Sequence, residues 1–341
     1  MAAKIVRSDP AAGGIRRRRC GRGFSYLGTD AVLIKDSRTL TRIRSLVIPP
    51  AWEDVWICAD PLGHIQAIGT DAAGRRQYRY HDLWREQRDQ AKHDRVRDFG
   101  AALPRIREVT CRHLEGRGLT RDRVLAAAIR LIDLGFFRPG GEEYAEEHGT
   151  FGLATIRKDH VTLSQGQLVF EYPAKGAKQR EQAVAEDQVC AVVRSLRRRR
   201  DGGDQLLVYR SGPRWHDVTA ADINDYLREV SRGDYTAKDF RTWHATVLAA
   251  VGLAVSESAA GREASRKRAI ARVVREVADY LGNTPAVARA SYIDPRIVEQ
   301  YEKGRTIASA LGELGKDCDF GDLATRDHAE KAVLRLLARH P

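Results

Sequence analysis

Short apolar segments alternate with polar turns in the first 80 residues of the chain. Apolar and polar residues alternate over 32–34, 55–57 and 65–68, which is the period of a strand with one buried face. Turns that contain proline or glycine separate these segments, whereas residues 36–47 have a helical pattern. This part of the chain therefore predicts a small, curled antiparallel sheet with one helix.

Most of the chain beyond residue 82 has the apolar spacing of helices. A period of two returns between residues 151 and 184, where turns at 164–166 and 173–176 predict an antiparallel meander. The predicted strands are 151–156, 160–163, 167–172 and 178–184, and the predicted helices are 120–137, 186–200, 219–231, a helix from 236, and 265–281.

These patterns predict an α+β protein with more than one domain, because 341 residues exceed the usual size of a single core. We expect a β-rich N-terminal domain over residues 23–88. A larger, mainly α-helical domain with a small antiparallel sheet is expected over residues 89–341.

The charge of the chain favours a polyanionic partner. Lys and Arg number 58 against 46 Asp and Glu, which gives a net charge of +12 and a pI of about 9.6. Nucleic acid is the commonest polyanion bound by so basic a chain. Residues 1–22, with arginine at every position from 16 to 19, are expected to form a flexible basic arm, either a solvated tail or a contact with a DNA backbone.

Several other classes of protein find no support in the sequence. No stretch of 18 apolar residues could span a membrane, and the N-terminus does not resemble a signal peptide, so we expect a cytoplasmic protein. Five scattered cysteines argue against a disulfide framework and a cysteine zinc site. The sequence has no phosphate-binding Walker loop, EF-hand loop or HExxH motif, so neither a metal nor another cofactor is expected.

Four cationic residues stand out in the helical part. Arg138 directly follows the helix predicted over 120–137 and precedes a Pro-Gly-Gly turn, while Lys175 lies at the tip of a predicted hairpin. Lys238 and Arg241 are three residues apart on one helix face, and His244 continues that face. Adjacent cations repel each other, so an anion opposite this helix face would explain why the two lie together. Taken singly, each of these residues is more typical of a solvated surface.

A second group of candidates surrounds a helix end. Gly282-Asn283 ends the basic amphipathic helix 265–281, and Thr284-Pro285 begins a short helix that precedes Tyr292. From this pattern alone, Tyr292 is either a buried tyrosine or a nucleophile.

Aromatic and cationic residues alternate after the predicted N-terminal sheet. Gln77 and Arg79 are expected on one face of a strand, with Tyr78 and Tyr80 on the other. This arrangement suits contact with bases and phosphates, although core packing of the tyrosines is the more usual outcome.

In combination these motifs resemble the type IB DNA topoisomerase family, in its small poxvirus-like and bacterial form. The matching motifs follow one another from about residue 26 to residue 300: Gly-Thr-Asp-x3-Arg ending at Arg75 with Gln77-Tyr78-x-Tyr80, Phe137-Arg138-x-Gly140, the Lys175 hairpin, Lys238-Asp239-Phe240-Arg241-Thr242, and Gly282-Asn283-Thr284-Pro285 to Ser291-Tyr292.

The resemblance implies a role for each matching residue. Tyr292 would attack a DNA phosphodiester to form a 3′-phosphotyrosyl bond, while Arg138 and Arg241 clamp the scissile phosphate. Lys175 would help to protonate the leaving 5′-oxygen, and Lys238 is a further basic residue at the site. Asn283 stands where poxvirus enzymes carry histidine, and it retains a hydrogen-bond donor without the charge.

The chemistry of these side chains is consistent with that assignment. Tyrosine has an ordinary pKa of about 10, so its attack requires stabilisation of the charge that develops on the phosphate. Arginine provides this with a planar fork that binds two oxygens, and a lysine in a partly dry pocket supplies a proton. A cationic set of this kind needs no divalent metal and no ATP.

For the N-terminal domain, the resemblance favours DNA contact by Arg75, Gln77, Tyr78 and Tyr80 over core packing. It also implies a monomer that closes as a clamp round duplex DNA in the nucleoid.

A tyrosine recombinase is the alternative function, but such enzymes typically carry histidine where Lys238 stands here. A non-catalytic DNA-binding protein on the same scaffold would not need the whole catalytic set.

Overall fold

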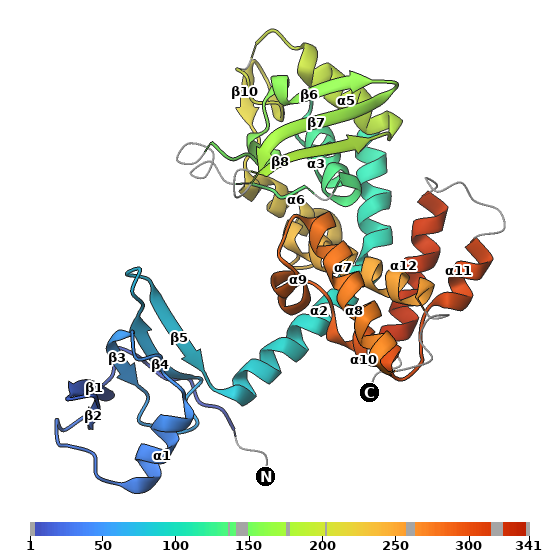
Figure 1. Cartoon of the computed structure of the whole chain (residues 1–341). Helices are drawn as coiled ribbons and strands as arrows, with labels where there is room; N and C mark the ends of the chain where they lie inside the picture. The colour runs from blue at the N-terminus through green and yellow to red at the C-terminus, as the bar shows by residue number, and fades with distance from the viewer. Residues whose placement is uncertain are drawn as a thin grey trace. The chain divides into compact units, whose positions relative to one another are not determined.

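The computed structural model describes residues 4–135, 137–140, 149–174, 178–201, 203–256, 263–314 and 323–338 (Figure 1). The chain separates into two compact units, Met1–Asp94 and Arg95–Pro341. The first unit is a strand-rich domain, and the second is mostly helical with two small sheets. The structure therefore has the two-domain α+β layout that the sequence predicts. Helix α2 (Asp82–Leu114) runs without a break through the junction that the sequence placed after residue 88.

The first unit is built on a five-stranded antiparallel sheet with the strand order β2-β1-β3-β4-β5. Helix α1 (Ser37–Ser45) is capped by the Asp36 carboxylate, which accepts a hydrogen bond from the Thr39 amide at 2.7 Å. Its Ile43 packs into the small core of this unit. The strands are β1 (Ile15–Cys20), β2 (Gly23–Leu27), β3 (Glu53–Ile57), β4 (Ile65–Thr70) and β5 (Arg76–Tyr80).

Two expectations for this unit are wrong. Strand β1 lies inside the region expected to be a flexible arm, and Arg17 on it stacks 4.1 Å from the centre of the Phe24 ring. The aliphatic stems and guanidinium groups of arginines can pack on a sheet, so consecutive arginines do not preclude a strand. Residues 32–34 form a single bridge, Leu27 to Leu33, instead of a strand.

The second unit is built around one large hydrophobic core, in which Phe99, Phe240 and Trp243 are fully buried. Strands β6 (Val161–Ser164), β7 (Gln167–Ala174) and β8 (Lys178–Val184) form the predicted meander. The remaining helices are α3 (Arg121–Gly135), α5 (Asp187–Arg198), α6 (Ala220–Ser231), α7 (Ala237–Val255), α8 (Glu263–Leu281), α9 (Pro285–Ser291), α10 (Pro295–Glu302), α11 (Ala308–Leu314) and α12 (Leu323–Ala338).

Two features of this unit differ from the sequence pattern. The strand predicted over 151–156 is a single 3₁₀ turn, Leu153–Thr155, because the Leu153 and Ala154 amides donate to the carbonyls of Arg138 and Pro139. A second hairpin, β9 (Val208–Ser211) with β10 (Arg214–Asp217), was not predicted.

A buried polar network joins the helices that carry the predicted site. The Asp133 carboxylate on α3 accepts hydrogen bonds from Arg107 at 2.9 and 3.1 Å, from Arg130 at 2.6 Å and from His244 at 3.0 Å. His244 is 3% exposed, as Arg241 is, but it binds Asp133 in the interior and so does not join the cationic set that its helical spacing suggests. Arg107 also binds Glu330, which ties α12 to this network.

In the described residues, no helix is long and apolar enough to cross a membrane.

Candidate active site

Helix α7 presents Lys238 and Arg241 one turn apart. The helix begins with a capping box, in which the Asp239 carboxylate accepts the Thr236 amide at 2.7 Å. Arg95 holds the same carboxylate through two hydrogen bonds of 2.8 and 2.9 Å. Lys238 is exposed, whereas Arg241 is 3% exposed, so the first turn of α7 is fixed and directs one cation inward.

Arg138 lies in the segment that follows α3, and backbone contacts hold this segment in place. The Leu153 amide donates to the Arg138 carbonyl at 2.8 Å. Gly140 has a φ of +83°, and a Cβ on Gly152 would lie 2.3 Å from its Cα. Only glycines allow the two chain segments to approach this closely.

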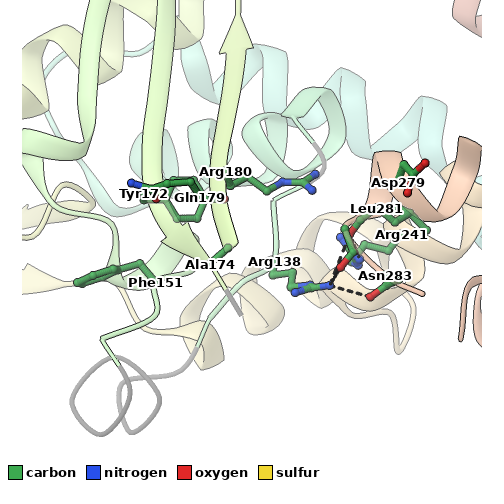
Figure 2. Close-up of a pocket in the computed structure, with 11 residues that line it drawn as sticks. Arg138, Phe151, Tyr172, Ala174, Gln179, Arg180, Arg241, Asp279, Leu281 and Asn283 are labelled. Atoms are coloured by element: carbon green, nitrogen blue, oxygen red, sulfur yellow. Dashed lines mark hydrogen bonds between the residues drawn. The ribbon is translucent and has the colours of Figure 1, made fainter. Parts of the chain in front are cut away.

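The C-terminal end of α8 lies opposite both arginines (Figure 2). Arg138 donates to the Gly282 carbonyl at 3.1 Å and to Asn283 Oδ1 at 2.8 Å. Arg241 donates to the Leu281 carbonyl at 2.9 Å. Gly282, with a φ of +62°, ends the helix and turns Asn283 toward Arg138. The Asn283 Nδ2 atom is buried and has no hydrogen-bond partner among the residues that the structure describes, so an amide donor is available there.

Tyr292 follows α9 directly and faces the same group. Its amide donates to the Ala288 carbonyl at 3.0 Å, and its carbonyl accepts from the Thr246 hydroxyl at 3.3 Å. The Arg241 guanidinium lies 5.3 Å from the centre of the Tyr292 ring. The side chain is half-buried and packs against the large core.

The electrostatics of the site are those of a cationic pocket with limited access to water. Burial, with the nearby charge of Arg138, lowers the pKa of Arg241 from 12.5 to about 10, while Tyr292 acts in the opposite direction. Burial also lowers the pKa of Arg138, an effect that Tyr292 opposes and Arg180 reinforces. Both arginines remain charged at neutral pH, but two neighbouring buried cations favour the arrival of an anion.

Two adjoining pockets open at these residues. The larger, of about 740 Å³, is lined by Arg138, Lys238, Arg241, Asn283 and Tyr292 together with Pro139, Gly140, Thr150, Phe151, Gly152, Gly282, Thr284 and Val287. The structure thus brings together five of the six residues predicted to be catalytic. The sixth, Lys175, lies outside the described residues.

The residues predicted to contact DNA belong to the first unit. Tyr78 and Tyr80 lie on one face of β5 with their rings 6.1 Å apart and nearly parallel. Tyr78 is 44% exposed, which argues against core packing for this side chain. Asp71 binds Arg75 at 3.1 Å and Gln77 at 2.9 Å.

Arg180 is a further residue at the site that the sequence did not single out. It lies on β8 and donates to the Tyr280 carbonyl at 2.9 Å, next to the carbonyls that Arg138 and Arg241 bind. In the sequence, only its place on a strand after the Lys175 hairpin could have indicated that Arg180 belongs to the site.

The described residues contain no group of three or more His, Cys, Asp or Glu side chains that could hold a metal ion.

Comparison with known proteins relates the whole arrangement to one family. Residues 81–316 match the model of the eukaryotic DNA topoisomerase I catalytic core, and residues 23–71 match that of the bacterial DNA topoisomerase IB N-terminal domain. The chain is 30% identical to the DNA topoisomerase 1B of Acanthamoeba polyphaga mimivirus, over 85% of this chain and 88% of the relative. It is 22% identical to the DNA topoisomerase 1B of vaccinia virus strain Copenhagen, over 73% of this chain and 75% of the relative. The chain belongs to the type IB DNA topoisomerase family.

Proposed function

We propose that this protein relaxes supercoiled duplex DNA by cleaving and resealing one strand at a time, with Tyr292 as the nucleophile. The observation that carries the proposal is the pocket in which Arg138, Arg241 and Asn283 surround Tyr292. Membership of the type IB DNA topoisomerase family supports the same activity.

The chemistry is a reversible transfer of a phosphodiester. The Tyr292 oxygen attacks the scissile phosphorus, a new P–O bond forms to the tyrosine, and the bond to the 5′-oxygen breaks. The 5′-hydroxyl end then rotates about the intact strand and attacks the phosphotyrosyl bond, which releases Tyr292. One ester replaces another in each direction, so the cycle consumes no ATP.

Tyr292 is a better candidate nucleophile than the nearby Tyr172. Tyr172 is 3% exposed, its hydroxyl donates to Gln182 at 3.0 Å, and burial raises its pKa to about 12. Tyr292 is half-buried and lines the larger pocket beside both clamp arginines. A phosphate in that pocket therefore meets one accessible phenol.

Arg138 and Arg241 would stabilise the charge that develops on the non-bridging phosphate oxygens. Removing a preorganised donor of this kind typically costs about 10²–10³ in rate. The free Nδ2 atom of Asn283 supplies a neutral donor to the same oxygens. Lys238, exposed at the pocket rim, adds positive charge, and Lys175 would give the proton that the 5′-oxygen needs.

We further propose that β5 reads the duplex next to the cleavage site. The exposed Tyr78 offers an apolar surface to bases, while Arg75 and Gln77 offer donors. The two units would enclose the duplex as a monomeric clamp, and the protein would act in the bacterial cytoplasm on nucleoid DNA. The net charge of +12 supports a polyanionic substrate.

The direct test is relaxation of supercoiled plasmid in EDTA without ATP. Both positive and negative supercoils are expected to relax in steps, because rotation about one intact strand has no preferred hand. Failure of both to relax would refute the proposed function. Recombination of two duplexes in place of relaxation would instead support a tyrosine recombinase, which the Lys238 position disfavours.

A further inference from the structure

We propose that Arg180 is a third phosphate-binding arginine, which holds the DNA phosphate next to the one bound by Arg138 and Arg241. The proposal rests on the proposed function, because it assigns a second phosphate of the same DNA strand to the site.

Arg180 reaches the site from a different element than the other two arginines. It lies on β8, opposite Tyr172 of β7, and its side chain extends toward the C-terminal end of α8 (Figure 2). Its Nη2 atom donates to the Tyr280 carbonyl at 2.9 Å. A Cβ placed on Gly282 would lie 2.8 Å from Arg180 Nη1, so this guanidinium contacts the turn that also carries Asn283.

The three arginines share an unusual set of acceptors. Arg180 donates to the carbonyl of residue 280. Arg241 and Arg138 both donate to the carbonyl of residue 281, and Arg138 also donates to the carbonyl of residue 282. The end of a helix carries a partial negative charge, which attracts cations but does not neutralise three of them.

Arginines that serve the fold of this unit are paired differently. Arg107 and Arg130 both bind carboxylates, with closest distances of 2.6–2.9 Å to Asp133, Glu330 and Glu186. In the described part of the chain, neither Arg138 nor Arg180 has a carboxylate within ion-pair distance. Their guanidinium groups are thus held in position by neutral carbonyls, and an anionic partner remains to be supplied.

The smaller of the two pockets is the place for that anion. Its volume is about 210 Å³, and Arg138, Arg180 and Arg241 all line it. One carboxylate, Asp279, also lines it, so cations outnumber anions by three to one. Arg180 lowers the pKa of both other arginines through charge repulsion, which an anion between them would relieve.

The two pockets adjoin, because Arg138, Arg241 and Asn283 line both. Successive phosphates of one DNA strand are spaced by about 3.4 Å along the helix axis. A strand with its scissile phosphate beside Tyr292 therefore brings the neighbouring phosphate to the smaller pocket. Arg180 is the arginine that lines the smaller pocket and not the larger one.

The salt dependence of DNA binding tests this assignment. Duplex binding would be measured by fluorescence anisotropy over a range of salt concentrations, in a Tyr292→Phe background that prevents covalent attachment. Arg180→Gln and Arg180→Lys both retain an N–H donor for the Tyr280 carbonyl, and only the lysine variant retains the charge. Arg121→Gln is the matched control, because Arg121 lies on α3 and already binds the Glu229 carboxylate at 2.8 and 3.0 Å.

Arg180→Gln is expected to reduce the slope of log K against log salt by about 0.9, the value for one lost phosphate contact on duplex DNA. Its affinity is expected to fall on the order of tenfold at a fixed salt concentration. Arg180→Lys is expected to keep the wild-type slope, and Arg121→Gln to change it little.

An unchanged slope for Arg180→Gln would overturn the assignment, and it would leave Arg180 as a tether between β8 and α8. The same conclusion follows if Arg180→Lys loses as much slope as Arg180→Gln, because the loss would then follow the altered tether and not the charge. Thermal melting of each variant shows whether it is folded, and plasmid relaxation by the wild-type protein is scored separately. Failure of wild-type relaxation would refute the proposed function, whatever the slopes are.

Discussion

Replacing Arg241 by lysine keeps a cation at the centre of the site but changes its chemistry. Arg241 is 3% exposed, donates to the Leu281 carbonyl at 2.9 Å, and lies over the Tyr292 ring. Lysine cannot bind two phosphate oxygens with one planar fork. It also loses its proton at a lower pH than arginine, so the substitution converts a fixed charge into a titrating one.

The size of the effect follows from the surroundings of Arg241. Burial and the charge of Arg138 bring its pKa from the ordinary 12.5 to about 10. A lysine starts from a pKa of about 10.4, so the same burial and charge repulsion bring its pKa below that ordinary value. The charged form is the active one, so activity is present below this pKa and is lost as the pH rises through it. Loss of the fork adds a decrease of about 10² at every pH.

The assay is the rate of covalent DNA cleavage at low DNA concentration, measured between about pH 6 and pH 9.5. Under these conditions the rate reports the ionisation of the free protein. The ratio of the Arg241→Lys rate to the wild-type rate removes every pH effect that the two proteins share. This ratio is expected to be constant at acidic pH and to fall by up to about tenfold for each pH unit once the pH exceeds the lowered pKa of the lysine.

A ratio that stays constant up to pH 9.5 would show that the lysine keeps its proton despite its burial, contrary to this prediction. Arg121→Lys serves as the control for an exposed position. Its ratio to wild type is expected to stay near one across the range.

Three further substitutions probe the support of the site. Asn283→Asp keeps the acceptor for Arg138 but removes the Nδ2 donor and adds a negative charge. The rate of single-turnover cleavage is therefore expected to fall by about 10²–10³. A decrease below tenfold would exclude a role for this donor. Gly152→Ala places a Cβ 2.3 Å from a backbone atom of the segment that carries Arg138. This clash would misplace the Arg138 side chain, so the cleavage rate is expected to fall by about 10² or more. An unchanged rate would show that the segment can move freely. Glu330→Gln deprives the mostly buried Arg107 of a charged partner, so we expect the free energy of unfolding to fall by about 3 kcal/mol in urea titration. A loss below about 1 kcal/mol would contradict the importance of this pair.

The sequence was most informative where local chemistry decides the structure. Helix ends and helix caps depend on residues that are close in the chain. The helix end at Gly282-Asn283, the new helix at Thr284-Pro285 and the caps at Thr219 and Thr236 lie where they were predicted.

The sequence was least informative where distant partners decide. His244 has the helical spacing of a site residue, but Asp133 on another helix holds it in the interior. Strand β1 forms despite its arginines because β2 and β3 pair with it on both sides. Arg180 could not be recognised without the fold, because nothing near it in the chain indicates that its side chain reaches the end of α8.

Identification of the residue that becomes attached to DNA tests most directly whether Tyr292 is the nucleophile. The protein would be trapped on nicked duplex DNA, digested, and analysed by mass spectrometry for the peptide that carries a 3′-phosphoryl nucleotide. We expect attachment at Tyr292 alone, complete loss of the adduct in Tyr292→Phe with DNA binding retained, and a normal adduct in Tyr172→Phe. An adduct that persists in Tyr292→Phe, or that maps to Tyr172, would contradict this expectation.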